Sequence, residues 1–197
     1  MKPPPFGYLR PESIEEATVA LAEHGYDAKP IAGGQSLVPL LNFRLSRPAV
    51  LIDLGRIPAL DGIAIDGGDL RIGAMTRQRT VERAPAVASA CPILVEALRH
   101  VGHVPIRNRG TIGGSIAHAD PAAELPTVAL LLDASIVARS VRGERVIPAA
   151  EFFVGPFSTT LEPDELVTEV VFPARPGMRT AFTEVARRHG DFAIAGV

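Results

Sequence analysis

The chain has 197 residues, 47% of them hydrophobic, and a formal net charge of −2. This composition suffices for one ordinary domain or two small ones with a real core, and it argues against disorder. The near balance of 20 Lys and Arg against 22 Asp and Glu argues against a nucleic-acid binder. One cysteine and five histidines without ligand spacing predict no metal site. The absence of a long apolar run predicts a cytoplasmic protein without a membrane span.

The first part of the chain predicts one clear helix, followed by short extended segments. Ser13 and Glu16 form a capping box, and Gly25 ends the helix that they open. The elements expected after it are an extended stretch over 29–32, a helical turn over 37–41, a strand over 50–53 and a hairpin that turns at Gly67 and Gly68.

The second part of the chain mixes helices with hairpins. Helical material over 77–101 is interrupted by Pro85 and Pro92, and 103–110 is expected to be a loop. Asp120 and Pro121 predict the start of another helix. The expected strands are 135–140 and 145–148, paired as a hairpin, then 166–172 and 180–188. This order predicts an α+β fold in two small lobes that meet near 54–60.

Two segments share the same chemical pattern, a pair of glycines followed closely by a hydroxyl residue. The first motif is Ala32, Gly33, Gly34, Gln35 and Ser36, and the second is Thr111, Ile112, Gly113, Gly114 and Ser115. A Gly-Gly turn can direct successive backbone N–H groups into one concavity that suits phosphate oxygens. Two such nests facing each other would suit a diphosphate.

Two interpretations of these motifs stay open, because Gly-Gly pairs are also common in ordinary tight turns. The chain has neither GxGxxG after its first strand nor GxxxxGK[ST], so a Rossmann or P-loop nucleotide site is not expected. Arg107 and Arg109 precede the second motif and are either solvated loop charges or groups that attract an anion.

Polar residues that follow the second motif allow further interpretations. Glu124 either accepts from ribose hydroxyls or is a surface carboxylate in the first turn of a helix. Ser115, His118 and Asp120 suggest a serine hydrolase, but residues so close in sequence rarely converge as a triad, and GxSxG is absent. We therefore expect no catalytic residue in this chain.

The motifs AGGQS at 32–36, IGAMT at 72–76, TIGGS at 111–115 and GPFSTTLEPDELV at 155–167 carry a family resemblance. The chain resembles the FAD-binding (medium) subunit of molybdenum hydroxylases, as in the carbon monoxide dehydrogenase medium chain and the xanthine dehydrogenase FAD-binding subunit. The resemblance implies the two-lobed α+β FAD-binding fold of the vanillyl-alcohol oxidase and molybdopterin dehydrogenase type. It also implies FAD-binding subdomains at 1–57 and 58–175, and the incomplete start of a C-terminal domain at 176–197.

The same resemblance implies roles for particular residues. Both glycine motifs would hold the FAD pyrophosphate, Glu124 would lie near the adenosine half, and Leu166 or Val167 would contact the isoalloxazine. The resemblance leaves the binding of other nucleotides or anions without redox work as an alternative, with a hydrolase as a weaker one.

The implied function is electron transfer from iron–sulfur clusters through FAD to an acceptor. The implied partners are a molybdenum-cofactor large subunit and a [2Fe-2S] small subunit, in a heterotrimer that dimerises. The sequence identifies neither the substrate nor the electron acceptor of such a complex.

Overall fold

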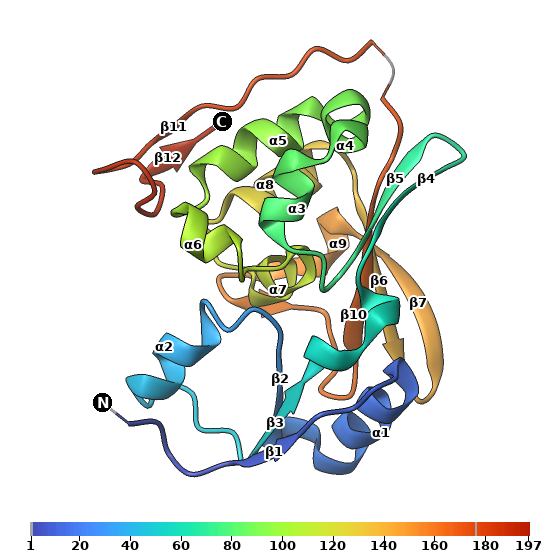
Figure 1. Cartoon of the computed structure of the whole chain (residues 1–197), viewed down its shortest axis with the longest axis vertical. Helices are drawn as coiled ribbons and strands as arrows, with labels where there is room; N and C mark the ends of the chain where they lie inside the picture. The colour runs from blue at the N-terminus through green and yellow to red at the C-terminus, as the bar shows by residue number, and fades with distance from the viewer. Residues whose placement is uncertain (1, 176) are drawn as a thin grey trace.

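The computed structural model describes residues 2–175 and 177–197 and contains two main sheets. A three-stranded sheet lies in the N-terminal part, and a five-stranded sheet lies beside a group of helices in the rest of the chain (Figure 1). The mixture of a parallel sheet, an antiparallel sheet and separate helices confirms the predicted α+β class.

The three-stranded sheet is parallel and is built from the first 53 residues. Its order is β1-β3-β2, with bounds Gly7–Leu9, Val50–Asp53 and Ala28–Ile31. Helix α1 (Ile14–His24) packs on this sheet, and its caps are the predicted ones: the Ser13 Oγ accepts from the Glu16 amide at 3.1 Å, and Gly25 follows with a φ of 49°. The buried residues of this part include Ala17, Leu21 and Ile52, which form the smaller of two cores. Helix α2 (Leu37–Asn42) follows β2, as the sequence predicts.

The five-stranded sheet is antiparallel, in the order β4-β5-β10-β6-β7. Its strands are β4 (Ile63–Asp66), β5 (Asp69–Gly73), β6 (Ser135–Ser140), β7 (Gly143–Pro148) and β10 (Leu166–Phe172). Both predicted hairpins are present, β4–β5 and β6–β7, and β10 joins them by pairing with β5 on one side and β6 on the other. The central place of β10 explains why five of its seven residues are buried, including the polar Thr168.

Short helices gather on one side of the five-stranded sheet (Figure 1) and bury the larger core. They are α3 (Gln78–Arg83), α4 (Pro85–Ala90), α5 (Pro92–His100), α6 (Val104–Arg107), α7 (Ile112–His118), α8 (Glu124–Leu131) and α9 (Ala149–Phe152). Pro85 and Pro92 each occupy the first position of a helix, where the missing amide costs nothing. Short pairs complete the fold: β8 (Phe153–Gly155) with β9 (Ser158–Thr159), and β11 (Glu184–Val185) with β12 (Ala195–Gly196).

Three predicted elements differ from the structure. Part of the loop expected over 103–110 is helix α6, and only Glu184–Val185 of the strand expected over 180–188 is a strand. The helix expected at Asp120 begins at Glu124 instead. Ala119 has a left-handed φ of 50°, and the Asp120 Oδ1 accepts from the Ala122 amide at 2.9 Å, so the polar residue closes a turn before the helix.

Backbone hydrogen bonds tie the residues after β5 to the segment before β4 and to α7. The Met75 amide donates to the Leu60 carbonyl at 2.8 Å, and the Gly113 amide donates to the Ala74 carbonyl at 2.9 Å. The first sheet ends at Asp53 and the second begins at Ile63. The subdomain boundaries at 57/58 and 175/176 stay predictions.

The contact at Gly113 gives a testable prediction for stability. Alanine is the better helix former, yet a Cβ on Gly113 would lie 2.4 Å from the Ala74 Cβ and 2.7 Å from its Cα. We expect Gly113→Ala to lower the free energy of unfolding by about 1–3 kcal/mol through overpacking, measured by urea denaturation. Gly155→Ala is the control, because a Cβ there meets nothing within 4 Å. Equal stability of Gly113→Ala and wild type would contradict the close packing of α7.

Candidate functional site

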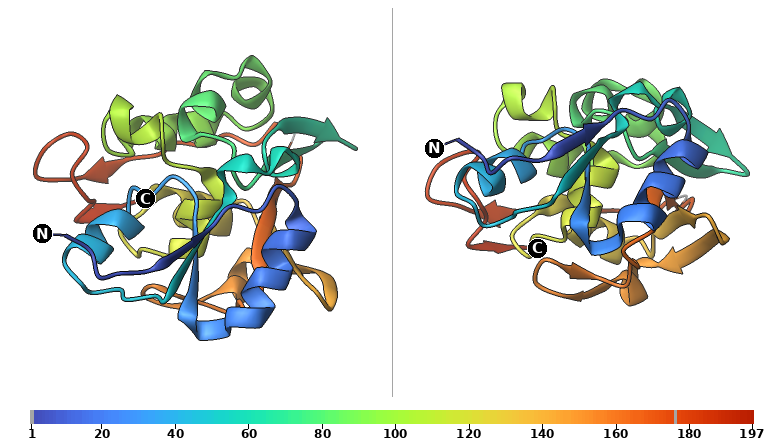
Figure 2. Two further views of the ribbon diagram at one scale, coloured as in Figure 1. Left: turned by 60° about the horizontal axis from the view of Figure 1, so that its bottom comes forward. Right: turned by 90° about the horizontal axis from the view of Figure 1, so that it is seen from below.

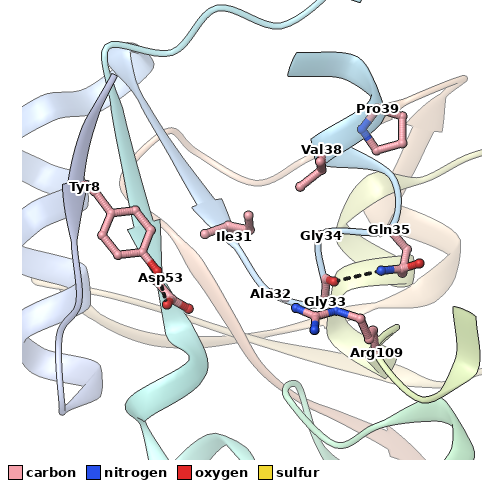
Figure 3. Close-up of a pocket in the computed structure, with 10 residues that line it drawn as sticks. All are labelled: Tyr8, Ile31, Ala32, Gly33, Gly34, Gln35, Val38, Pro39, Asp53 and Arg109. Atoms are coloured by element: carbon pink, nitrogen blue, oxygen red, sulfur yellow. Dashed lines mark hydrogen bonds between the residues drawn. The ribbon is translucent and has the colours of Figure 1, made fainter. Parts of the chain in front are cut away.

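A cavity of about 470 Å³ lies beside the first glycine motif. Figure 3 shows the residues that line it: Tyr8, Ile31, Ala32, Gly33, Gly34, Gln35, Val38, Pro39, Asp53 and Arg109. Asp53 is the last residue of β3, and Ala32 follows β2 directly. The cavity is therefore at the carboxyl ends of parallel strands, where sheets of this kind commonly bind ligands.

The first glycine motif presents unpaired backbone donors next to this cavity. Gly34 has a φ of 73°, and its carbonyl accepts from the Val38 amide at 3.0 Å as the chain enters α2. The amides of residues 33–36 donate no hydrogen bond to any other residue that the structure describes. Unpaired N–H groups in a tight turn carry positive partial charge, and this arrangement suits an anion. The predicted nest is consistent with the geometry here.

The second glycine motif has a different structure from the one expected. It is not a Gly-Gly turn but the start of α7, in which the Thr111 Oγ1 accepts from the Gly114 amide at 3.1 Å. The Ile112 amide donates to the Thr76 carbonyl at 3.1 Å, and the Gly113 amide donates to Ala74. The expectation of a second amide nest is therefore wrong, because these donors are already paired inside the protein.

Burial limits which residues of the second motif can contact a bound molecule. Thr111, Ile112 and Gly113 are buried, whereas Gly114 and Ser115 are partly exposed. A cofactor contact at this motif stays a prediction, and of its five residues Gly114 and Ser115 offer surface for it.

The two motifs nevertheless lie against each other, although 75 or more residues separate them in sequence. A Cβ on Gly33 would lie 2.2 Å from the Arg109 carbonyl oxygen, and a Cβ on Gly114 would lie 3.5 Å from the Ala32 Cβ. Glycine is required at position 33 because the backbone that leads into the second motif occupies the space of a side chain. The two motifs are therefore close together, as the sequence predicts, and they meet by van der Waals packing.

The two arginines before the second motif have different environments. Arg109 lines the cavity, and its carbonyl accepts from the Arg77 guanidinium. Arg107 is buried, where its Nε donates to Glu82 at 2.9 Å and its Nη1 donates to the Val101 carbonyl at 2.9 Å. Burial raises the pKa of the Glu82 carboxyl, but hydrogen bonds from Arg107 and Arg79 outweigh burial and lower it. Arg109 is thus the arginine of this pair that can attract an anion, while Arg107 fixes the loop.

Tyr8 and Asp53 form a polar wall of the cavity that sequence reasoning missed. The Tyr8 hydroxyl donates to the Asp53 carboxylate, and this hydrogen bond, aided by burial, raises the pKa of Tyr8. Asp53 also accepts from the Gly55 amide at 2.9 Å and pairs with the Arg10 Nε at 3.3 Å. An aspartate at the carboxyl end of a predicted strand was the available signal, but its partners are distant in sequence.

The other predicted contacts lie away from this cavity. Glu124 begins α8 and lines a second cavity of about 110 Å³ together with Phe182 and Glu184. Burial raises the pKa of Glu124 to about 7, with the Glu184 and Asp120 carboxylates adding to the effect. Leu166 and Val167 are each 4% exposed, within the smaller and the larger core respectively, and they line neither cavity. The structure therefore gives no surface for the flavin-ring contact expected of these two side chains.

The serine hydrolase interpretation finds no support in the geometry. His118 packs on Phe157 with ring centroids 5.2 Å apart, and no hydrogen bond joins Ser115, His118 and Asp120 among the residues that the structure describes. Across residues 2–175 and 177–197, no His, Cys, Asp and Glu side chains gather in a group suited to a metal ion. Within those ranges no helix has the length and apolar character needed to span a membrane.

Comparison with known proteins supports a specific family. A 6-hydroxypseudooxynicotine dehydrogenase complex subunit alpha from Paenarthrobacter nicotinovorans is 52% identical over the whole chain, which covers 67% of that protein. The caffeine dehydrogenase subunit beta of Pseudomonas sp. (strain CBB1) is 46% identical, again with 67% of its length covered. The solved carbon monoxide dehydrogenase from Hydrogenophaga pseudoflava has a chain that matches with a TM-score of 0.97 at 41% identity. That match covers all of this chain and 69% of the solved one.

The family model described as the FAD binding domain in molybdopterin dehydrogenase matches residues 4–175. The match includes both glycine motifs, both main sheets and the cavity between β1, β3 and α2. The structural agreement extends to the β11–β12 segment beyond the matched range. The chain belongs to the family of FAD-binding domains of molybdopterin dehydrogenases.

Proposed function

We propose that the cavity beside Gly33 and Gly34 holds FAD, the cofactor of the family, with the pyrophosphate at the first glycine motif. The observation that carries this placement is the set of unpaired amides at residues 33–36, next to the Arg109 side chain. A diphosphate needs several donors when it leaves water, and fixed amides with one guanidinium supply them. Gly114 approaches the first motif from the side of α7, since a Cβ there would lie 3.5 Å from the Ala32 Cβ.

The rest of the cavity suits a flat ring system. Tyr8 and Ile31 lie on one side of it, and Val38 and Pro39 of α2 lie on the other (Figure 3). Tyr8 and Val38 are 53% and 41% exposed, so both present apolar surface that a ring of the dinucleotide can cover. We place one of the two FAD ring systems between these walls.

The chemistry of the reaction belongs to the cofactor, which takes up and releases electrons when it is bound. The residues of this chain bind FAD, orient it and exclude water from one side. This division of work is consistent with the lack of an acid–base triad around Ser115.

We propose that the chain acts as the FAD-binding electron-transfer subunit of a molybdenum hydroxylase. Its partners would be a large subunit with the molybdenum cofactor and a [2Fe-2S] small subunit, in a heterotrimer that dimerises in the cytoplasm. The names of the relatives support an assembly, since they describe a dehydrogenase complex subunit alpha and a dehydrogenase subunit beta. The substrate would be bound by another polypeptide of that assembly.

Gly114→Val tests the placement of the cofactor. The new side chain would project between the Thr111 Oγ1, 2.7 Å from a Cβ at this position, and the Ala32 Cβ. We expect FAD affinity to fall at least a hundredfold in a fluorescence-quenching titration. The loss of the Thr111 cap costs only about 1 kcal/mol, so thermal unfolding should still show a folded protein. Gly155→Val should bind FAD like the wild type, and an unchanged FAD content in Gly114→Val would refute the placement.

Tyr8→Ala tests the proposed ring site, and the second tyrosine of the chain provides a matched control. Tyr26 is 88% exposed and lies outside the cavity. We expect Tyr8→Ala to weaken FAD binding about fivefold, because stacking against an aromatic ring contributes about 1 kcal/mol. Tyr26→Ala should leave the dissociation constant unchanged. Equal affinities of the two variants would place the rings elsewhere.

A further inference from the structure

The C-terminal segment of the chain lies over the helices rather than within a sheet of the core. Residues 177–197 run across α5 toward α6 and contain the β11–β12 pair (Figures 1 and 2). Phe182 packs against the larger core, and Gly190 approaches α6 so closely that a Cβ would lie 2.7 Å from the Gly102 carbonyl oxygen. An isolated two-stranded ribbon is at best marginally stable in water, so this contact must hold the segment in place.

Titratable side chains gather at this contact. Three of the five histidines lie there: His100 at the end of α5, His103 before α6, and His189 in the segment itself. The His100 Nδ1 lies 3.3 Å from the Glu184 Oε1, and the rings of His100 and His189 are 6.3 Å apart between centroids. Histidine is the side chain whose charge changes in the range between pH 5 and 8.

Two buried carboxylates face the second cavity at the same place. The Glu184 side chain is 4% exposed, and its Oε2 is buried without a hydrogen-bond partner. Glu124 of α8 is 8% exposed and lines the same cavity of about 110 Å³. No lysine or arginine is among the residues described as lining this cavity, so nothing there neutralises a second negative charge.

We propose that His100, Glu124 and Glu184 form a pH-sensitive clasp that holds residues 177–197 on α5 and α8 and loosens as the pH rises from about 6 to 8. At the lower pH Glu124 is neutral, and the buried space holds the Glu184 carboxylate beside His100. At the higher pH Glu124 is charged as well, which places two carboxylates in the same buried space. Their repulsion acts against the contact.

The environment of Glu124 determines the direction in which the stability of the contact changes with pH. Burial, then the Glu184 and Asp120 carboxylates, raises its pKa from 4.5 to about 7, while Arg107 acts in the opposite direction. A carboxyl whose pKa is raised in the folded state stabilises that state at low pH, and the contribution is lost as the pH rises through 7. His103 and His189 are the other titratable groups at this contact.

Hydrogen exchange of the full chain at pH 6, 7 and 8, corrected for intrinsic exchange rates, tests the clasp. The reporters are the Thr183 and Ile194 amides, which donate to Val197 and Val185 at 2.8 Å within the segment. We expect their protection to fall tenfold or more from pH 6 to pH 8, while amides of β10 keep theirs. That difference separates local release from global unfolding.

Variants identify the groups responsible. Glu124→Gln stays neutral and should reduce the pH dependence severalfold, and His100→Gln, which removes the partner of Glu184, should lower the protection at every pH. Glu151→Gln, an isosteric change at an exposed position of α9, should behave like the wild type. Constant protection of the wild type between pH 6 and 8, or an undiminished pH dependence in Glu124→Gln, would overturn the proposal. Neither result depends on FAD binding.

Discussion

The structure depends on the close approach of other parts of the backbone to its two glycine motifs. Gly33 touches the Arg109 carbonyl, and Gly113 touches Ala74, at distances where no Cβ fits. These contacts bring a turn after β2 and the start of α7 together, although their sequences are far apart. The cavity beside Gly34 is lined by residues of β1, β3 and α2 together with Arg109 from the segment before α7.

Two motifs that share a Gly-Gly pair and a nearby serine therefore have different structural roles. In the first, Gly34 has a positive φ, and the amides of residues 33–36 have no partner among the described residues and lie beside the cavity. In the second, Gly113 and Gly114 have helical backbone, and their amides are paired with Ala74 and Thr111. Gly113 and Gly114 are needed for their small size, because α7 must pack closely against both Ala74 and Ala32.

Local signals were enough to predict most of the elements. The capping box at Ser13, the prolines at 85 and 92 and the glycine turn of the β4–β5 hairpin act through neighbouring residues, and each is found where expected. The start of α7 was misassigned because Gly-Gly is a turn signal by itself, whereas tertiary packing selects the helix. Tyr8, Asp53 and the burial of Arg107 could not be predicted, because their partners come from other parts of the chain.

The charges around the cavity explain why backbone donors matter in this chain. Arg109 is the one cationic side chain among the described residues that line it, and Asp53 on the opposite wall already pairs with Arg10 and accepts a hydrogen bond from Tyr8. With FAD placed as proposed, recognition of its diphosphate would rest largely on amides whose positions are set by the fold. Amides do not titrate and cannot rotate away, so the diphosphate would be held at a place fixed relative to Ile31 and Val38. A cofactor whose rings must keep a constant orientation for electron transfer is well served by such rigid donors.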